Sequence, residues 1–218
     1  MQCPGFEVEY ETPSGIKKCS CDSFYASDSA FRDEWNKYSN AEKLIEEVSS
    51  FLPNYKVDIV LTGGEPLLYW KNKEFQKFMK YYVSNDYRVT IETNASINID
   101  LFEEWHKKIT FSMSVKLSNS GESISKRINV NTLNEIINNA KDSYLKFVVD
   151  QKFLDKAAKE IDDILSQIPS CEVYLMPLGD TSEIIDTNSL SVIELALEKG
   201  YKYSDRLHIR VWNNKRGV

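Results

Sequence analysis

The feature that most limits how this chain folds is the alternation of short, β-branched apolar runs with longer amphipathic stretches. The apolar runs predict strands at residues 57–61, 88–92, 110–115, 144–149, 172–176 and 207–212. The amphipathic stretches predict helices at residues 40–52, 72–84, 100–107, 131–140, 153–168 and 189–199. Strands that alternate with helices form βα units, whose right-handed crossovers place the strands side by side. The pattern therefore predicts an α/β fold with a parallel sheet and outer helices.

The length and composition predict one ordinary globular domain over residues 1–218. With 42% hydrophobic and 28% charged residues, a chain of this size buries roughly 70% of its unfolded surface and needs no disulfide or structural metal to fold. No stretch approaches the roughly 20 apolar residues that span a bilayer, and the first residues resemble no secretory signal. We therefore expect a cytoplasmic protein with no membrane partner.

The charge pattern bears on which partners the chain can bind. Lys and Arg number 27 and Asp and Glu number 33, which gives a net charge of −6, and the two signs are interspersed. Attraction to a phosphate backbone needs a surplus of positive charge that this chain lacks. Nucleic acid is therefore not expected as a partner.

The cysteines are unevenly distributed, because Cys3, Cys19 and Cys21 crowd the N-terminus while Cys171 stands alone. Disulfides explain this poorly in a chain without a secretory signal, and soft thiolates in one segment indicate zinc or an iron–sulfur cluster. A structural zinc site usually takes four ligands, so three cysteines favour a cluster with one open iron. Incidental thiols in a flexible segment are the alternative. Cys171 is interpreted as a small buried apolar residue, and His106 as a solvated helix residue.

The second candidate site is the segment Thr62-Gly63-Gly64-Glu65-Pro66, which follows the predicted strand 57–61. Two glycines there let the backbone approach a ligand closely and expose amide and carbonyl groups that can hold a small polar molecule. The segment lacks the features of a P-loop or a dinucleotide-binding site, and a turn that needs positive φ is the alternative. Glu92 and Asn94, at the end of the next strand, are further polar candidates, with ordinary capping as their alternative.

Together, the cysteines and the glycine segment resemble the radical S-adenosylmethionine (SAM) superfamily, in which three cysteines hold a [4Fe-4S] cluster and a GGEP motif ends the second barrel strand. Within it, the chain resembles the 7-carboxy-7-deazaguanine synthases of queuosine biosynthesis. The similar segments run along nearly the whole chain: Cys21-Asp22-Ser23, Thr62-Gly63-Gly64-Glu65-Pro66, Ile91-Glu92-Thr93-Asn94, Ser114-Val115-Lys116, Lys146-Phe147-Val148-Val149, Tyr174-Leu175-Met176-Pro177 and Leu207-His208. The resemblance implies a partial TIM-type βα barrel.

The resemblance also implies an activity. It implies a lyase that contracts 6-carboxy-5,6,7,8-tetrahydropterin to 7-carboxy-7-deazaguanine and releases ammonia. The implied cofactors are a [4Fe-4S] cluster, SAM and Mg²⁺, with a reducing electron donor as a partner, and a homodimer is favoured. A glycyl-radical-activating enzyme and a non-catalytic cysteine-metal binding module remain as alternatives.

The resemblance assigns roles residue by residue. It places SAM against Asp22, Gly63, Gly64, Glu65, Ser114, Lys116, Lys146, Phe147, Val148 and Val149. It places the pterin against Thr62, with Glu92, Asn94 and His208 as further substrate candidates. Ser23 stands where the family usually has Thr and is the expected hard oxygen ligand of Mg²⁺.

The cysteine spacing departs from the usual family pattern CxxxCxxC and leaves two ligand sets open. On one interpretation, Cys21 is the last ligand, Cys3 the middle one and Cys19 an extra thiol, while the first ligand and the first barrel strand precede Met1. That N-terminally truncated chain would have weak or absent activity, and full cluster content with turnover would contradict it. On the other interpretation, Cys3, Cys19 and Cys21 together are the full set in a rearranged loop.

Overall fold

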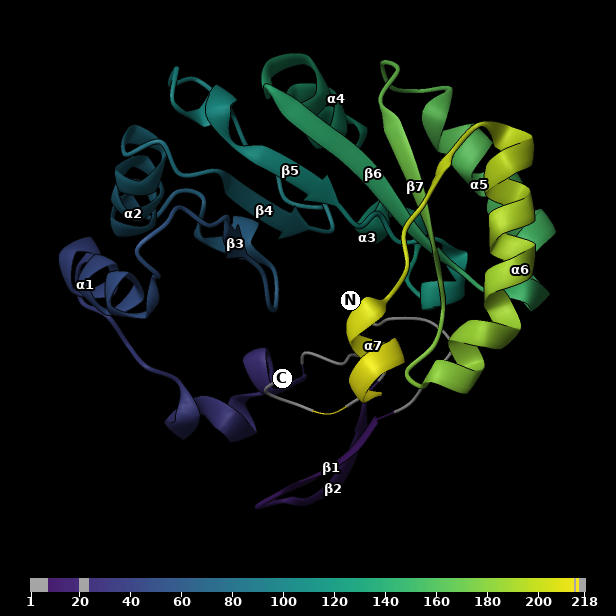
Figure 1. The fold of residues 1–218 in the computed structure, drawn as a ribbon, viewed down its shortest axis with the longest axis horizontal. Coiled ribbons are helices and arrows are strands. Elements are labelled where there is room, and N and C mark those ends of the chain that lie inside the picture. The colour runs from purple at the N-terminus through teal and green to yellow at the C-terminus, as the bar shows by residue number, and fades with distance from the viewer. Residues whose placement is uncertain (1–7, 20–23, 214, 216–218) are drawn as a thin grey trace.

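A computed structural model describes residues 8–19, 24–213 and 215 of the chain. Its centre is a six-stranded parallel sheet in the order β3-β4-β5-β6-β7-β8. The strands are β3 (Ile59–Leu61), β4 (Val89–Thr93), β5 (Thr110–Met113), β6 (Asp142–Val149), β7 (Glu172–Pro177) and β8 (Lys202–Tyr203). Within the described residues, β3 and β8 are the two edges and do not pair with each other. The predicted parallel sheet is confirmed, and it forms an open, incomplete barrel (Figure 1).

The main helices lie on the outer side of the curved sheet, and the other side faces the interior of the arc (Figure 1). They are α1 (Ala41–Phe51), α2 (Lys73–Ser84), α4 (Val130–Asn139), α5 (Leu154–Leu165) and α6 (Ser182–Lys199). Side-chain caps fix where several of them begin: Asn72, for example, accepts hydrogen bonds from the backbone of Glu74 and Phe75. The end of α6 is fixed by Gly200, which adopts the left-handed conformation at φ 68°.

Shorter helical elements connect the strands and helices. Two are α-helical, α3 (Ile124–Arg127) and α7 (Leu207–Trp212). The rest are 3₁₀ turns: η1 (Phe24–Ala26), η2 (Ser29–Glu34), η3 (Pro66–Tyr69), η4 (His106–Lys108), η5 (Ser118–Ser120) and η6 (Gln151–Phe153). None of the described helices is long and apolar enough to cross a membrane.

The hydrophobic core lies between the sheet and the outer helices. Successive side chains of a strand point to opposite faces, and in β6 the buried residues are Leu145, Phe147 and Val149. They join apolar residues of α2, α4, α5 and α6 in one core cluster. The alternate residues Tyr144 and Lys146 are only half-buried and occupy the opposite, inner face. The sheet therefore separates an apolar outer layer from a polar inner face.

An antiparallel hairpin of β1 (Val8–Thr12) and β2 (Gly15–Cys19) precedes the sheet in the chain. Tyr10 Oη donates to Asp28 Oδ2 over 2.7 Å, and Lys17 Nζ lies 2.9 Å from the same oxygen. The Tyr10 ring stacks on Phe24 with centroids 4.2 Å apart. Hydrogen bonds from the backbone of Ala30, from Lys17 and from Tyr10 lower the pKa of Asp28 to about 2. The hairpin is thus docked on η1 and η2 by one carboxylate and an aromatic stack.

The strand predicted at residues 207–212 is wrong, because these residues form the helix α7, while the sixth strand is β8. Leu207, Ile209 and Val211 alternate as in a strand, but only Ile209 is buried. The backbone amides of Ile209 and Arg210 both bond to the carbonyl of Arg206, which starts a helical turn. A six-residue apolar run is too short for its periodicity to distinguish the two structures. The helix predicted at 189–199 begins earlier, at Ser182.

The helix predicted at residues 100–107 is also wrong. Only the 3₁₀ turn η4 forms at its end, and the backbone before it is bonded to other elements: Leu101 N donates to Glu135 Oε1 over 2.8 Å, and the carbonyl of Asp100 accepts from Trp70. These tertiary bonds replace the i→i−4 ladder of a helix.

The interpretation of His106 as a solvated residue is corrected as well. Its side chain is buried, its Nε2 lies 2.7 Å from Gln76 Oε1, and its Nδ1 accepts from the backbone of Glu103. Burial lowers the pKa of the imidazole, so His106 is a hydrogen-bonded core residue. Cys171 is half-buried against the edge of the core, and burial raises the pKa of its thiol.

Candidate functional site

Most of the predicted site residues that the structure describes lie at one edge of the sheet. The strands are parallel, so their carboxyl ends meet there. The residues in question end or follow β3, β4, β5 and β6: Thr62, Gly63, Gly64, Glu65, Glu92, Asn94, Ser114, Lys116, Lys146, Phe147, Val148 and Val149. The topology therefore gathers side chains that are up to about ninety positions apart in the sequence.

A chain of polar contacts crosses the inner face from β3 to β6. Thr62 Oγ1 donates to Glu92 Oε2 over 2.9 Å, and Lys146 Nζ lies 3.2 Å from Glu92 Oε1. The Lys146 side chain is 17% exposed and that of Glu92 is 39% exposed. Because its two oxygens are bonded to the side chains of Thr62, just after β3, and of Lys146, on β6, Glu92 does not act as an ordinary backbone cap. These three side chains present a hydroxyl, a carboxylate and an ammonium group to the open face.

Asn94 fits its capping alternative better. Its Oδ1 accepts a hydrogen bond from the backbone of Ser96 over 2.9 Å, which is a local Asx turn. Its backbone N–H donates to Glu65 Oε2 over 2.8 Å. The side chain of Asn94 therefore already has a structural role, and its role in binding substrate stays a prediction.

The glycine segment forms a tight loop at the end of β3. Gly63 and Gly64 have φ angles of 80° and 56°, so the turn with positive φ is present. Glu65 caps η3 by accepting from Leu67 N over 3.1 Å, and its carboxylate also accepts from Thr93 Oγ1 over 2.6 Å. Since the Glu65 carboxylate holds the loop to β4, the groups that the loop offers to a ligand are the exposed backbone atoms of Gly63 and Gly64.

The sequence did not point to Thr93 as part of this loop. Its hydroxyl donates to Glu65 and accepts from the backbone of Ala95 over 2.9 Å. Thr93 could be assigned to this loop only if the pairing of β3 with β4 were known, because that pairing brings the end of β4 beside the loop.

The segment after β5 also reaches this edge. Ser114 N donates to the carbonyl of Thr93 over 2.7 Å, which ties the segment to the end of β4. Val115 and Leu117 are buried, while Ser114 and Lys116 are half-buried, so the two polar residues share a side. Lys116 Nζ lies 3.4 Å from Ser114 Oγ. These two residues therefore present a hydroxyl and an ammonium group beside the glycine loop.

The predicted cofactor-binding run at the end of β6 divides between the two faces. Lys146 and Val148 are half-buried on the inner face, whereas Phe147 and Val149 are fully buried in the core. A ligand at the inner face reaches only the backbone of Phe147 and Val149. The carbonyl of Val149 is already an acceptor for Leu178 N at 2.9 Å.

The predicted cluster and Mg²⁺ ligands lie outside the described residues: Cys3, Cys21, Ser23 and the side chain of Cys19. Asp22, which is predicted to contact SAM, lies outside them as well. The residues that follow them are described, and η1 lies beside the glycine loop. A Cβ on Gly63 would stand 3.6 Å from Ala26 Cβ, and one on Gly64 would stand 3.7 Å from the carbonyl oxygen of Ala26. The described residues that follow the cysteine segment therefore lie next to the GGEP loop. The part of the chain that the structure describes holds no group of three or more potential metal ligands, so the cluster assignment stays a prediction.

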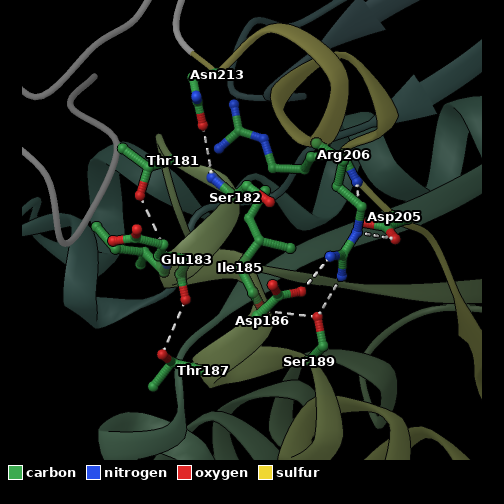
Figure 2. A network of polar contacts seen from close by, with 12 residues as sticks. Thr181, Ser182, Glu183, Ile185, Asp186, Thr187, Ser189, Asp205, Arg206 and Asn213 are labelled. Carbon is green, nitrogen blue, oxygen red and sulfur yellow. Dashed lines mark hydrogen bonds and ion pairs between the residues drawn. The ribbon is translucent and has the colours of Figure 1, made fainter.

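His208 lies exposed on α7, which is fastened to the carboxyl side of the sheet. The buried Arg206 donates from Nη1 to the carbonyl of Gly179, just after β7, over 2.8 Å. Arg210 bonds to Asp205, Asp186 and Ser189, and these three partners are labelled in Figure 2. The Asn213 side chain accepts from Ser182 N at the start of α6 over 2.9 Å. The sequence did not reveal this network, because a strand was predicted there.

Several known proteins resemble this chain in sequence. The family model of the radical SAM superfamily matches residues 19–150. The 7-carboxy-7-deazaguanine synthase of Rhodopirellula baltica is 30% identical over an alignment of 212 positions, which covers 91% of this chain and 75% of the relative. The synthase of Halobacterium salinarum is 29% identical over an alignment of 212 positions, which covers 89% of this chain and 77% of the relative.

Solved structures show the same fold. The crystal structure of QueE from Escherichia coli aligns with a TM-score of 0.56 and 13% identity over 93% of this chain and 92% of that chain. SuiB from Streptococcus suis aligns with a TM-score of 0.56 and 12% identity over 81% of this chain and 46% of that chain. At these identities the likeness concerns the fold alone.

Proposed function

Because the chain belongs to the radical SAM superfamily and, within it, to the 7-carboxy-7-deazaguanine synthases, we propose that it is a carbon–nitrogen lyase of that kind. It converts 6-carboxy-5,6,7,8-tetrahydropterin to 7-carboxy-7-deazaguanine and releases ammonia. The observation that carries this proposal in the structure is the Thr62–Glu92–Lys146 chain beside the GGEP loop.

The chain's residues fit SAM at the carboxyl edge of the sheet. The exposed backbone of Gly63 and Gly64 suits a ligand that needs close approach, and Ser114 and Lys116 supply a hydroxyl and a positive charge beside it. Together with the [4Fe-4S] cluster and an electron donor, bound SAM supplies one-electron cleavage of a carbon–sulfur bond and hence hydrogen abstraction. The protein's part is to position the reactants and to exclude water.

The inner face suits a pterin. The Glu92 carboxylate accepts hydrogen bonds, and a pterin presents N–H donors along its pyrimidine edge. Lys146 offsets the charge of Glu92, and Thr62 fixes the orientation of the carboxylate from the opposite side. His208 is a further substrate candidate on α7, and Ser23 is proposed to contribute an oxygen to Mg²⁺, which orients the substrate.

We place the protein in the cytoplasm, where thiols that ligate a cluster stay reduced. We also expect a homodimer, by analogy with the family, and sedimentation of the reconstituted protein at several concentrations would show it.

Anaerobic reconstitution with iron and sulfide tests the function directly. We expect a brown protein that cleaves SAM on reduction and forms 7-carboxy-7-deazaguanine from the pterin. Glu92→Gln should lower product formation about a hundredfold and leave SAM cleavage in place. Asp58→Asn, an exposed carboxylate at the opposite end of the sheet, is the matched control and should leave both unchanged.

Three outcomes would contradict the proposal at different levels. A colourless protein with stoichiometric zinc would support the cysteine-metal binding module instead. SAM cleavage without any binding of the pterin would point to the glycyl-radical activase, although the relatives do not favour it. Equal losses in Glu92→Gln and Asp58→Asn would remove the assigned role of Glu92.

A further inference from the structure

A buried ion pair lies behind the segment that follows β5. Arg127 Nη1 on α3 is 3.3 Å from Glu160 Oε2 on α5, and the two side chains are 8% and 16% exposed. By contrast, the pair of Lys199 with Asp162, also on α5, is 27% and 50% exposed. Lys156 adds a third charge at 3.9 Å from Glu160 Oε1. The Arg127–Glu160 pair is therefore largely removed from solvent.

Both members of the pair bond to the backbone of the same segment. Arg127 Nη1 donates to the carbonyl of Lys116 over 3.1 Å, and Glu160 Oε2 accepts from Ser118 N over 2.8 Å. The other Glu160 oxygen accepts from the hydroxyl of Ser118. This segment lies beyond the end of β5, so no sheet ladder supplies these bonds. The pair is therefore hydrogen-bonded to the backbone on both sides of Leu117.

Stability alone is a poor reason for such a pair. Replacing a buried ion pair with apolar residues of similar size often leaves a protein equally stable or more stable. This pair is also incompletely compensated, because Arg127 Nε is buried without a hydrogen-bond partner among the described residues. A function that depends on the position of the backbone at Lys116 and Ser118 explains the pair better.

The segment that contains this backbone includes two residues of the proposed SAM site, Ser114 and Lys116. Val115 and Leu117 are 2% exposed and anchor the segment in the core. The alternate residues Ser114 and Lys116 are half-buried, and the Ser114 amide is bonded to the end of β4, at the carboxyl edge of the sheet. A shift of the Lys116 carbonyl or the Ser118 amide would move the Lys116 ammonium group with it.

We propose that Arg127 and Glu160 are positioning residues for SAM: they hold the Ser114–Lys116 segment in the conformation that binds it. This inference rests on the proposed function, because the roles of Ser114 and Lys116 do. Neither Arg127 nor Glu160 is expected to touch the cofactor. Their effect is transmitted through the backbone of Lys116 and Ser118.

The decisive variant is the double substitution Arg127→Met with Glu160→Leu, which removes both charges and conserves volume. We expect its urea midpoint to stay close to that of the wild type. In the cluster-loaded enzyme, the Kd for SAM should rise about tenfold and the KM for the pterin should change less than about twofold. In cluster-free protein, amide hydrogen exchange in residues 114–120 should become faster.

Two matched variants separate positioning from a general structural effect. Arg127→Lys keeps a hydrogen-bond donor and a positive charge, so it should bind SAM more tightly than the double variant does. Asp162→Asn breaks an exposed pair on the same helix and should leave SAM affinity and exchange in residues 114–120 unchanged.

The outcomes also separate this inference from the proposed function. Wild-type, cluster-loaded protein that binds no SAM would overturn the proposed function, and the positioning role with it. If the wild type binds SAM, unchanged SAM affinity and unchanged exchange in the double variant would overturn the positioning role alone. An equal loss of affinity in Asp162→Asn would do the same.

Discussion

The loops that follow β3 and β5 reach the same edge of the sheet, but they are held in different ways. The loop at residues 62–66 is held through its own residues, because its glycines adopt positive φ and its Glu65 side chain both caps the next turn and accepts from Thr93 and Asn94 at the end of β4. The segment at residues 114–118 is held by Glu160, which is 42 positions from Ser118, and by Arg127. One loop is anchored by a side chain of its own, whereas the other depends on side chains of two helices.

The difference shows which changes each loop tolerates. A self-held loop responds to substitutions within it, because its conformation is built into the backbone. A loop held from a distance tolerates changes in its own side chains, but it moves when a partner on another element is lost. The predictions below test this contrast, starting with the largest expected effect.

The largest effect is expected from breaking the remote support on one side. Glu160→Leu leaves the buried Arg127 guanidinium without its carboxylate, and we expect the free energy of unfolding to fall by about 3–5 kcal/mol. Adding Arg127→Met should recover most of this loss. Urea unfolding of the single and double variants measures both values. If Glu160→Leu alone is as stable as the wild type, the role of the buried pair is contradicted.

The next effect is expected within the self-held loop. Glu65→Ala removes the acceptor for Thr93, Asn94 and Leu67, and we expect a loss of about 2–3 kcal/mol in the free energy of unfolding. Glu65→Gln keeps one oxygen acceptor and should lose less. If both variants unfold at the wild-type urea concentration, Glu65 does not hold the loop to β4.

A smaller effect is expected from the loop's backbone. Gly63→Ala places a Cβ no closer than 3.6 Å to a neighbour, so only the positive φ is penalised, by about 1 kcal/mol. Gly121 has a similar φ of 73°, and a Cβ added there would meet nothing within 4 Å, so Gly121→Ala is the matched control. Both should lose similar stability in urea, but only Gly63→Ala should weaken SAM binding. Equal SAM affinity in the two variants would remove Gly63 from the site.

The smallest effect concerns the hairpin, whose anchor Asp28 bonds to residues 11 and 18 positions away. The pKa of Asp28 is lowered from 3.8 to about 2 in the folded state. Its stabilising contribution is therefore present above about pH 4 and is lost as the pH falls through about 2. The difference in urea midpoint between wild type and Asp28→Asn should shrink across this range. A difference that stays constant from pH 5 to pH 2 would contradict this anchor.

Much of the fold could be predicted from local patterns. In β6, Leu145, Phe147 and Val149 alternate with more polar residues and lie on the buried face, as a half-buried strand requires. In α7, Leu207 and Val211 alternate in the same way, yet Arg206 and Arg210 fix this segment as a helix through bonds to Gly179 and to α6. The pattern is equally good in both cases, and only the tertiary partners differ.

The candidate site divides in the same way. The GGEP turn could be predicted, because positive φ is a property of its own glycines. Lys146 and Glu92 were each singled out as strand-end residues, but their ion pair joins positions 54 apart. Whether two such side chains meet depends on the register of β4, β5 and β6, which neither local segment encodes.

The sequence by itself determined most of the succession of strands and helices and the conformation of the glycine loop, because both follow from neighbouring residues through periodicity and backbone sterics. Only the tertiary structure decided that α7 is a helix, that Glu92 joins Thr62 to Lys146, and that Arg127 and Glu160 hold the backbone around Leu117. These contacts arise when distant segments pack against one another, and their free energy depends on burial and geometry that no local pattern specifies.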